Sequence, residues 1–192
     1  YREAKKLIGR GYFMVDGKVI REPGHPVGLM DVLSIPKLKK YFRILPDSHY
    51  GLILHEIKES ESIFKLCRIA GKTTIKGGHI QLNLHDGRNI LIRVKDPKNP
   101  KEDIYKRMDV LKISIPEQEI IKSLEFKEGN LALIMSGKNI GQVGQITKIL
   151  KRFGPNASTV SIQHNSDITE TLYDYTFIIG EEQYEISVPK LE

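Results

Sequence analysis

Hydrophobic residues at the start of the chain recur with helical spacing. Ala4, Leu7 and Ile8 share one side of a helix, and most charged residues around them fall elsewhere. Gly9 and Gly11 follow, and glycines are typical of a helix C-terminus. The pattern predicts a short amphipathic helix that ends at these glycines.

The next hydrophobic positions flank a turn. Residues 12–15 and 18–20 are mostly apolar and enclose the dipeptide Asp16-Gly17. A two-residue hairpin turn with positive φ at both positions favours Asp-Gly, so the pattern predicts a β-hairpin. A Pro- and Gly-rich loop, a returning strand and a basic connector are predicted after it, at residues 23–28, 29–35 and 36–40.

The middle and last parts of the chain carry many short strand patterns. Residues 80–84 alternate with period two, and Asp86-Gly87 turns them into the next apolar run. The strands predicted in the middle are residues 50–54, 63–69, 80–84, 89–94 and 110–115. Those predicted at the end are residues 131–135, 143–151, 159–163, 176–179 and 184–188. Five short strands in so short a segment fit a small barrel.

Composition and charge narrow the class of protein. The chain has 192 residues, a net charge of +6 and one cysteine. No apolar run approaches the ~20 residues of a membrane-spanning helix, and one cysteine excludes an internal disulfide and suits a reducing cytosol. The positive charge favours a polyanionic partner.

The charge is uneven along the chain and follows three segments. Residues 1–48 carry +5, residues 49–125 carry +3 and residues 126–192 carry −2. We expect a basic face at the front of the molecule rather than a uniformly basic surface. The predicted fold class is α+β and mostly β, with a helix-plus-hairpin module, a central β domain and a C-terminal barrel over these three segments.

Two stretches near the front resemble a known RNA-binding module. Residues 2–8 followed by 15–19 are similar to the second half of the S4 RNA-binding domain, in which a basic helix leads into a Val-Asp/Asn-Gly hairpin. Residues 26–35 continue with Pro-x-Gly-x-Met-Asp-Val. This continuation resembles the archaeal and eukaryotic small-subunit ribosomal protein S4e family.

A third stretch extends the resemblance toward the C-terminus. Residues 126–134 and 136–144 look like a KOW motif, the glycine-rich hairpin of an SH3-like barrel. The order of partial S4 domain, β domain and KOW barrel is that of the S4e family. Further matches at residues 65–67, 85–88 and 188–190 spread the resemblance over nearly the whole chain.

The resemblance implies a structural, non-enzymatic constituent of the small ribosomal subunit. The expected partners are small-subunit rRNA and neighbouring ribosomal proteins in the cytoplasm, with no membrane, cofactor, metal or small-molecule substrate. An arginine-bearing helix normally opens the S4 domain, and it is absent from this sequence. We therefore expect the RNA face of the first module to be partial.

RNA binding needs cations that reach phosphates from a rigid frame. The candidate RNA-binding residues are Arg2, Lys5, Lys6, Arg10, Lys18, Arg21, Lys37, Lys39, Lys40, Arg43, Arg68, Lys72, Lys138, Asn139, Lys148, Lys151 and Arg152. The first group lies on the helix, the hairpin and the basic connector, where the positive charge is densest. Because the last segment is acidic overall, its RNA contact should be local to the KOW loop and the nearby cations.

Each cluster also has a purely structural interpretation. A Lys-rich helix is commonly just a solvated face. Glycines around Lys138 satisfy a turn without any RNA role. Tyr12, Phe13 and Phe42 have the chemistry to stack on bases, but core packing is the simpler explanation for each.

Catalytic and metal motifs fail when their spacing is examined. Gly71-Lys72-Thr73 matches the end of a P-loop, but Leu66 stands where the first glycine is required. The six histidines are scattered without zinc spacing.

Two other functions remain as alternatives. An RNA-modifying enzyme would need a catalytic domain, and the middle segment is too small for one. A transcription elongation module would bind polymerase through the KOW barrel, and its usual partner domain is not recognisable ahead of that barrel.

Overall fold

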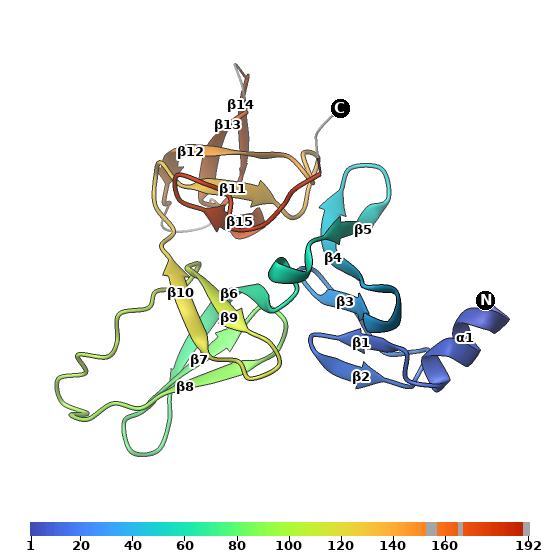
Figure 1. Ribbon diagram of the computed structural model, residues 1–192. Helices are drawn as coiled ribbons and strands as arrows, with labels where there is room; N and C mark the ends of the chain where they lie inside the picture. Colours follow the sequence, from blue (N-terminus) through green and yellow to red (C-terminus); the bar gives the residue numbers. More distant parts are fainter. Residues whose placement is uncertain (153–156, 165–166, 190–192) are drawn as a thin grey trace.

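Over its described residues, the chain folds into one α-helix and three antiparallel β-sheets, with short 3-10 helices between strands. The computed structural model describes residues 1–152, 157–164 and 167–189. Helix α1 (Arg2–Gly9) is followed by three sheets of five strands each (Figure 1). The predicted class, α+β and mostly β, is confirmed. Within the described ranges, none of the helices has the length and apolar character required to span a membrane.

The first sheet has the strand order β2-β1-β3-β4-β5. Its strands are β1 (Phe13–Val15), β2 (Lys18–Ile20), β3 (Val32–Ile35), β4 (Lys40–Asp47) and β5 (Gly51–Ile57). The predicted hairpin turn is present, with φ of 48° at Asp16 and 76° at Gly17. The predicted returning strand is shorter than expected because Met30 has a φ of 67°, which extended backbone does not adopt.

The connector after β3 is one residue shorter than predicted, and the strand β4 that follows it was not predicted. A short 3-10 helix η1 (Pro36–Leu38) occupies its first part, and Lys40 already belongs to β4. Strand β5, which the sequence placed in the middle segment, pairs with β4 along its whole length. The first sheet therefore extends to Ile57, beyond the boundary expected after residue 48.

The second sheet has the order β10-β9-β6-β7-β8. A 3-10 turn η2 (Glu59–Glu61) leads into its strands β6 (Phe64–Thr74), β7 (Ile80–Leu84), β8 (Asn89–Ile92), β9 (Val110–Ser114) and β10 (Ile120–Leu124). Strands β7, β8 and β9 lie within two residues of their predicted bounds, whereas β6 extends from the predicted end at residue 69 to Thr74. Strand β10 was not predicted as a strand.

The third sheet has the order β14-β13-β12-β11-β15. Its strands are β11 (Leu131–Ile134), β12 (Val143–Leu150), β13 (Thr159–His164), β14 (Asp167–Leu172) and β15 (Thr176–Gly180), with the 3-10 turn η3 (Tyr173–Tyr175) before the last. Strand β14 was not predicted. The strand predicted at 184–188 is wrong, since only an isolated bridge between Gly180 and Tyr184 forms there. The end of this segment, residues 190–192, lies outside the described residues.

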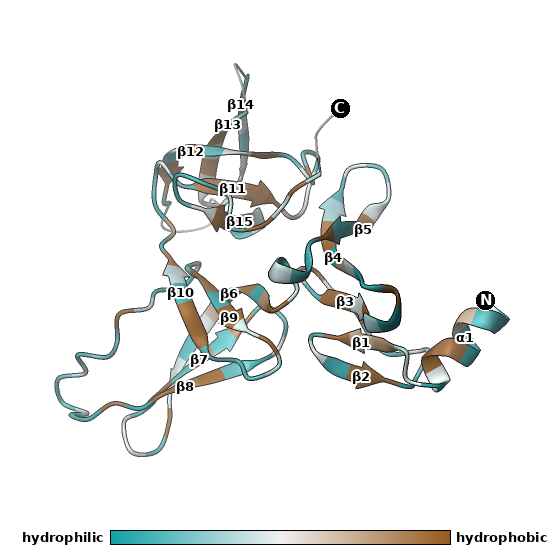
Figure 2. Ribbon diagram, viewed as in Figure 1, coloured by the Kyte–Doolittle hydropathy of each residue, from teal (hydrophilic) through white to brown (hydrophobic). Residues whose placement is uncertain are grey.

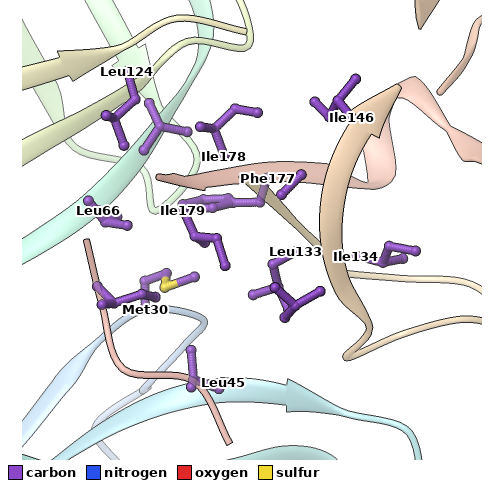
Figure 3. Close-up of a cluster of buried hydrophobic side chains, with 14 of the residues drawn as sticks. Met30, Leu45, Leu66, Leu124, Leu133, Ile134, Ile146, Phe177, Ile178 and Ile179 are labelled. Atoms are coloured by element: carbon purple, nitrogen blue, oxygen red, sulfur yellow. The ribbon is translucent and has the colours of Figure 1, made fainter. Parts of the chain in front are cut away.

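One hydrophobic core joins the three sheets. Met30 and Leu45 from the first segment, Leu66 and Leu124 from the second, and Phe177 from the third are at most 1% exposed. Figure 3 shows their side chains converging from separate parts of the chain. Figure 2 shows hydrophobic colour concentrated in the strands and hydrophilic colour in most connecting loops. Because the sheets bury apolar surface against one another, they hold surface cations in fixed relative positions.

Candidate nucleic-acid interface

Helix α1 presents its cations to solvent. The helix has no buried residue, and Arg2, Lys5 and Lys6 are all exposed. Its C-terminus is tied to the hairpin, because the Tyr12 N–H donates to the Leu7 carbonyl at 3.3 Å. The predicted basic helix therefore exists and is anchored to the first sheet at one end.

Several predicted cations meet where α1 joins the hairpin. The Lys37 Nζ lies 3.8 Å from the centre of the Tyr12 ring. Hydrogen bonding from Lys37 and its positive charge lower the pKa of Tyr12, and Arg10 adds to this effect. The Nε of Arg21 lies 3.5 Å from the position that a Cβ would take on Gly11. Arg10, Arg21 and Lys37 are thus gathered around one short stretch of backbone.

We call the exposed cations of this region the helix face, comprising Arg2, Lys5, Lys6, Arg10, Lys18, Arg21, Lys37 and Lys39. Among the described residues, none of them forms an ion pair with a carboxylate. Lys40, predicted to belong with them, instead pairs with Glu56 on the adjacent strand. The aromatic side chains considered for base stacking are Tyr12, Phe13 and Phe42. Each is half-buried, so one part of it packs inside the protein and another part is exposed.

Arg43 was predicted to contact RNA and is instead buried. Its guanidinium is fully enclosed and donates to the Phe64 carbonyl at 3.1 Å and to the Glu61 carbonyl at 3.0 Å. Its Nε also lies 3.3 Å from a Glu61 carboxylate oxygen. Arg43 therefore joins the first sheet to the start of the second and cannot reach a phosphate.

Two cations of the middle segment are also used internally. Arg68 Nη1 donates to the carbonyls of Asp174 at 2.7 Å and Thr176 at 3.0 Å, which links the second sheet to the third. Lys72 pairs with Asp103 and donates to the Tyr105 carbonyl at 2.8 Å. Lys72 remains exposed, but its charge is already compensated.

The third sheet brings together part of the predicted KOW contact. A hollow of about 520 Å³ is lined by Lys138, Asn139 and Arg152 together with Thr159 and Tyr175. The Thr159 hydroxyl is buried and has no hydrogen-bond partner among the described residues. The predicted loop cation and Arg152 thus share one surface depression.

The other two cations predicted on the third sheet lie outside this hollow. Lys148 is exposed on β12. Lys151 is also exposed, with its Nζ 5.9 Å from the centre of the Tyr173 ring.

A buried charge cluster was not foreseen from the sequence. Lys65, 1% exposed, lies 3.1 Å from Asp16, 2.5 Å from Asp31 and 2.7 Å from Asp86. Arg88 pairs with Asp16 as well. These contacts join the hairpin turn of the first sheet to the β7–β8 turn of the second. The one available signal was a lysine inside the apolar run 63–69.

Beside this cluster, three potential metal ligands come together. One ligand atom each from Cys67, His85 and Asp86 lies within 4.8 Å of the others. The Asp86 Oδ2 already accepts from Lys65 at 2.7 Å, and the His85 Nδ1 lies 3.2 Å from the Arg68 backbone nitrogen. Burial raises the pKa of the Cys67 thiol, which keeps it protonated. Asp86 is thus committed to Lys65 and the Cys67 thiol stays protonated, so the trio offers a metal ion no free anionic ligand.

Comparisons with known proteins agree with this architecture. The model of the ribosomal family S4e matches residues 38–120. Small ribosomal subunit protein eS4 of Desulfurococcus amylolyticus is 48% identical over 190 residues, covering 98% of this chain and 75% of the relative. The protein of the same name from Methanocaldococcus jannaschii is 47% identical over 183 residues, covering 95% of this chain and 74% of the relative.

A solved structure extends the likeness to the fold. The crystal structure of the 30S ribosomal protein S4e from Thermoplasma acidophilum matches with a TM-score of 0.80 and 30% identity. The match covers 95% of this chain and 88% of that one. Since relatives at nearly half identity align over almost its whole length, the chain belongs to the ribosomal protein family S4e.

Proposed function

We propose that the chain is a structural constituent of the small ribosomal subunit that binds rRNA through the helix face. The observation that carries this is the contrast between the cations of that face and the cations buried or half-buried where the sheets meet. The helix-face cations are exposed and form no ion pairs among the described residues, whereas Arg43, Lys65 and Arg68 are consumed by internal contacts. Uncompensated exposed cations are the ones that release counterions when they meet phosphates.

The core supports this function by fixing the spacing of the cations. A phosphate backbone presents negative charges at regular intervals. A rigid binding face can hold each of its cations opposite a phosphate, which fixes where the protein sits on the RNA. Strands β1 to β4 carry the hairpin and η1, and apolar side chains of the first segment enter the shared core. We infer that the sheets serve as a platform and that catalysis is not part of the function.

We propose a second, local RNA contact at the hollow beside the KOW loop. Lys138 and Arg152 supply charge there, and Asn139 supplies hydrogen-bonding groups. Lys148 on β12 and Lys151 just after that strand extend this contact. Because residues 126–192 carry a net charge of −2, we expect the RNA contact of this segment to be limited to these cations. We also propose that the three sheets correspond to the three modules of the family. The protein would act in the cytoplasm, within a ribosome and beside other ribosomal proteins.

Sedimentation of the tagged protein in its own cells tests the proposal. We expect the full-length protein to migrate with small subunits in a sucrose gradient and to be released by washing at high salt. A variant with Lys5→Glu and Lys6→Glu should shift toward the free fractions. Recovery of the wild-type protein only in free fractions, at low salt, would overturn the proposed function.

A further inference from the structure

The far end of the second sheet is built from two loops that pack together. One is the β6–β7 turn, residues 75–79, and the other is the start of the long β8–β9 loop. The Val94 N–H donates to the His79 Nδ1 at 3.1 Å. A Cβ on Gly78 would lie 2.5 Å from the Cβ of Pro97, so the two loops are in close contact. Val94 is buried in the hydrophobic cluster of the second sheet and anchors the long loop.

This end carries a group of cations that were not among the residues selected from the sequence. We call it the basic tip, comprising Lys76, Arg93, Lys95, Lys98 and Lys101. All five side chains are exposed. Among the described residues, none of the five forms an ion pair.

Three acids lie in or beside the basic tip, Asp96, Glu102 and Asp103, against its five cations. The Asp96 carboxylate accepts from the Lys98 backbone N–H at 3.0 Å, as in an Asx turn. Asp103 pairs with Lys72. Asp96 and Glu102 offset two of the five positive charges, so the tip keeps a net positive charge. Its loop is longer than a connection between adjacent strands requires.

The basic tip and the helix face lie on different sides of the molecule. In Figure 1 the β8–β9 loop extends from one end of the molecule, and α1 lies at the opposite side. Figure 2 shows that the loop is mostly hydrophilic. The shared core lies between them, so one short RNA helix bound to α1 does not also cover the tip.

We propose that the basic tip binds the phosphate backbone of a second RNA segment, separate from the one on the helix face. The inference rests on the proposed function. Lysines dominate the tip, and lysine ammonium groups on flexible stems suit phosphates as point charges. The cores of protein–protein interfaces are instead depleted of lysine and enriched in aromatic residues, which the tip lacks. The protein would thereby bridge two parts of a folded RNA.

A pair of charge reversals tests the inference. The tip variant carries Lys95→Glu and Lys98→Glu, which remove positive charge from the tip. The control variant carries Lys106→Glu and Lys127→Glu, which make the same change in charge beside Glu125. Binding of the full chain to in vitro transcribed small-subunit rRNA is measured against KCl concentration. We expect the tip variant to bind more weakly and its salt slope to fall by about 0.7–0.9 for each phosphate that the protein no longer neutralises. The control variant should keep the wild-type slope.

The same assay separates failure of the inference from failure of the proposed function. A third variant carries Lys5→Glu and Lys6→Glu, and a fourth combines these with the tip reversals. If the two RNA-binding surfaces act independently, the fold-reductions in affinity of the two pairs should multiply. Wild-type binding by the tip variant, with weakened binding by the α1 variant, would overturn the inference alone. Wild-type binding by both would overturn the proposed function as well.

Release of a neighbouring protein from assembled subunits, with RNA affinity retained, would assign the tip to a protein and also overturn the inference.

Discussion

The ammonium of Lys65 lies 3.1 Å from the carboxylate of Asp16, although 49 positions separate them in sequence. Asp16 occupies the first turn of the first sheet, and Lys65 lies on a central strand of the second. Asp31 and Asp86 complete the surroundings of the ammonium. The ion pair therefore holds the sheet that carries the helix face against the rest of the molecule.

Replacing Lys65 with methionine should destabilise the protein strongly. The change leaves three carboxylates partly buried beside one another, with only Arg88 to compensate them among the described residues. Breaking one partner of a buried ion pair typically costs about 3–5 kcal/mol. Denaturant unfolding measures this cost. The matched control Lys40→Met removes the exposed pair with Glu56 and should cost less than about 1 kcal/mol. Equal destabilisation in the two variants would contradict the structural role of Lys65.

Arg43 should matter for stability and not for RNA binding. Arg43→Met leaves the Phe64 and Glu61 carbonyls without their donor, and we expect the unfolding free energy to fall by about 3–5 kcal/mol. At a temperature where the variant remains folded, its rRNA affinity and salt slope should match the wild type. Lys37→Met is the control and should show the reverse pattern. A reduced salt slope in folded Arg43→Met would contradict the internal role of the guanidinium.

Stability should decline as the pH falls from 6.5 toward 5, partly because of His85. Burial lowers the pKa of His85 from its usual 6.5, although the nearby Asp86 carboxylate opposes this. The folded state then binds fewer protons than the unfolded state, so this contribution is complete above pH 6.5 and is lost as the pH falls through the lowered pKa. In His85→Gln the decline should be shallower. Some slope should remain, because burial also lowers the pKa of His55. An unchanged profile for His85→Gln would contradict this origin.

Gly144 should not accept a side chain. A Cβ there would overlap the carbonyl of Gln163 on the paired strand β13. Because backbone must move to make room, Gly144→Ala should lower the unfolding free energy by about 1–3 kcal/mol. At Gly9, on exposed α1, a Cβ meets nothing within 4 Å, so Gly9→Ala should be neutral or slightly stabilising. Thermal melting of the two variants distinguishes them, and similar melting temperatures would contradict the close approach of β12 and β13.

The elements that could be predicted from the sequence are those marked by turn residues or by alternating apolar residues within a few positions. The Asp16-Gly17 turn and the alternation of residues 80–84 became β1–β2 and β7 because turn geometry and periodicity act over a few residues. Strand β14 reads Asp-Ile-Thr-Glu-Thr-Leu and is largely solvated, so its pattern gave no comparable signal. Strand β5 was placed in the wrong segment because only pairing with β4 assigns it to the first sheet.

The candidate site was predictable in its charge but not in its pairing. Counting lysines and arginines identified the front of the molecule, and most of those cations are exposed in the structure. The count could not foresee that Arg68 would reach a carbonyl 106 positions away, or that Arg43 would be buried. Such interactions depend on how the sheets pack around the shared core. The basic tip was missed although four of its cations lie within residues 93–101, because the sequence does not show that this loop packs against the turn at residues 75–79.

The salt dependence of rRNA binding tests the central claim most directly. The full-length wild type is compared with Arg10→Glu combined with Lys37→Glu, and with the control Lys106→Glu combined with Lys127→Glu. The helix-face variant should bind more weakly, and the slope of log affinity against log salt should shrink by about 0.7–0.9 for each phosphate left without its cation, while the control keeps the wild-type slope. Identical slopes for all three proteins would contradict the assignment of RNA binding to the helix face.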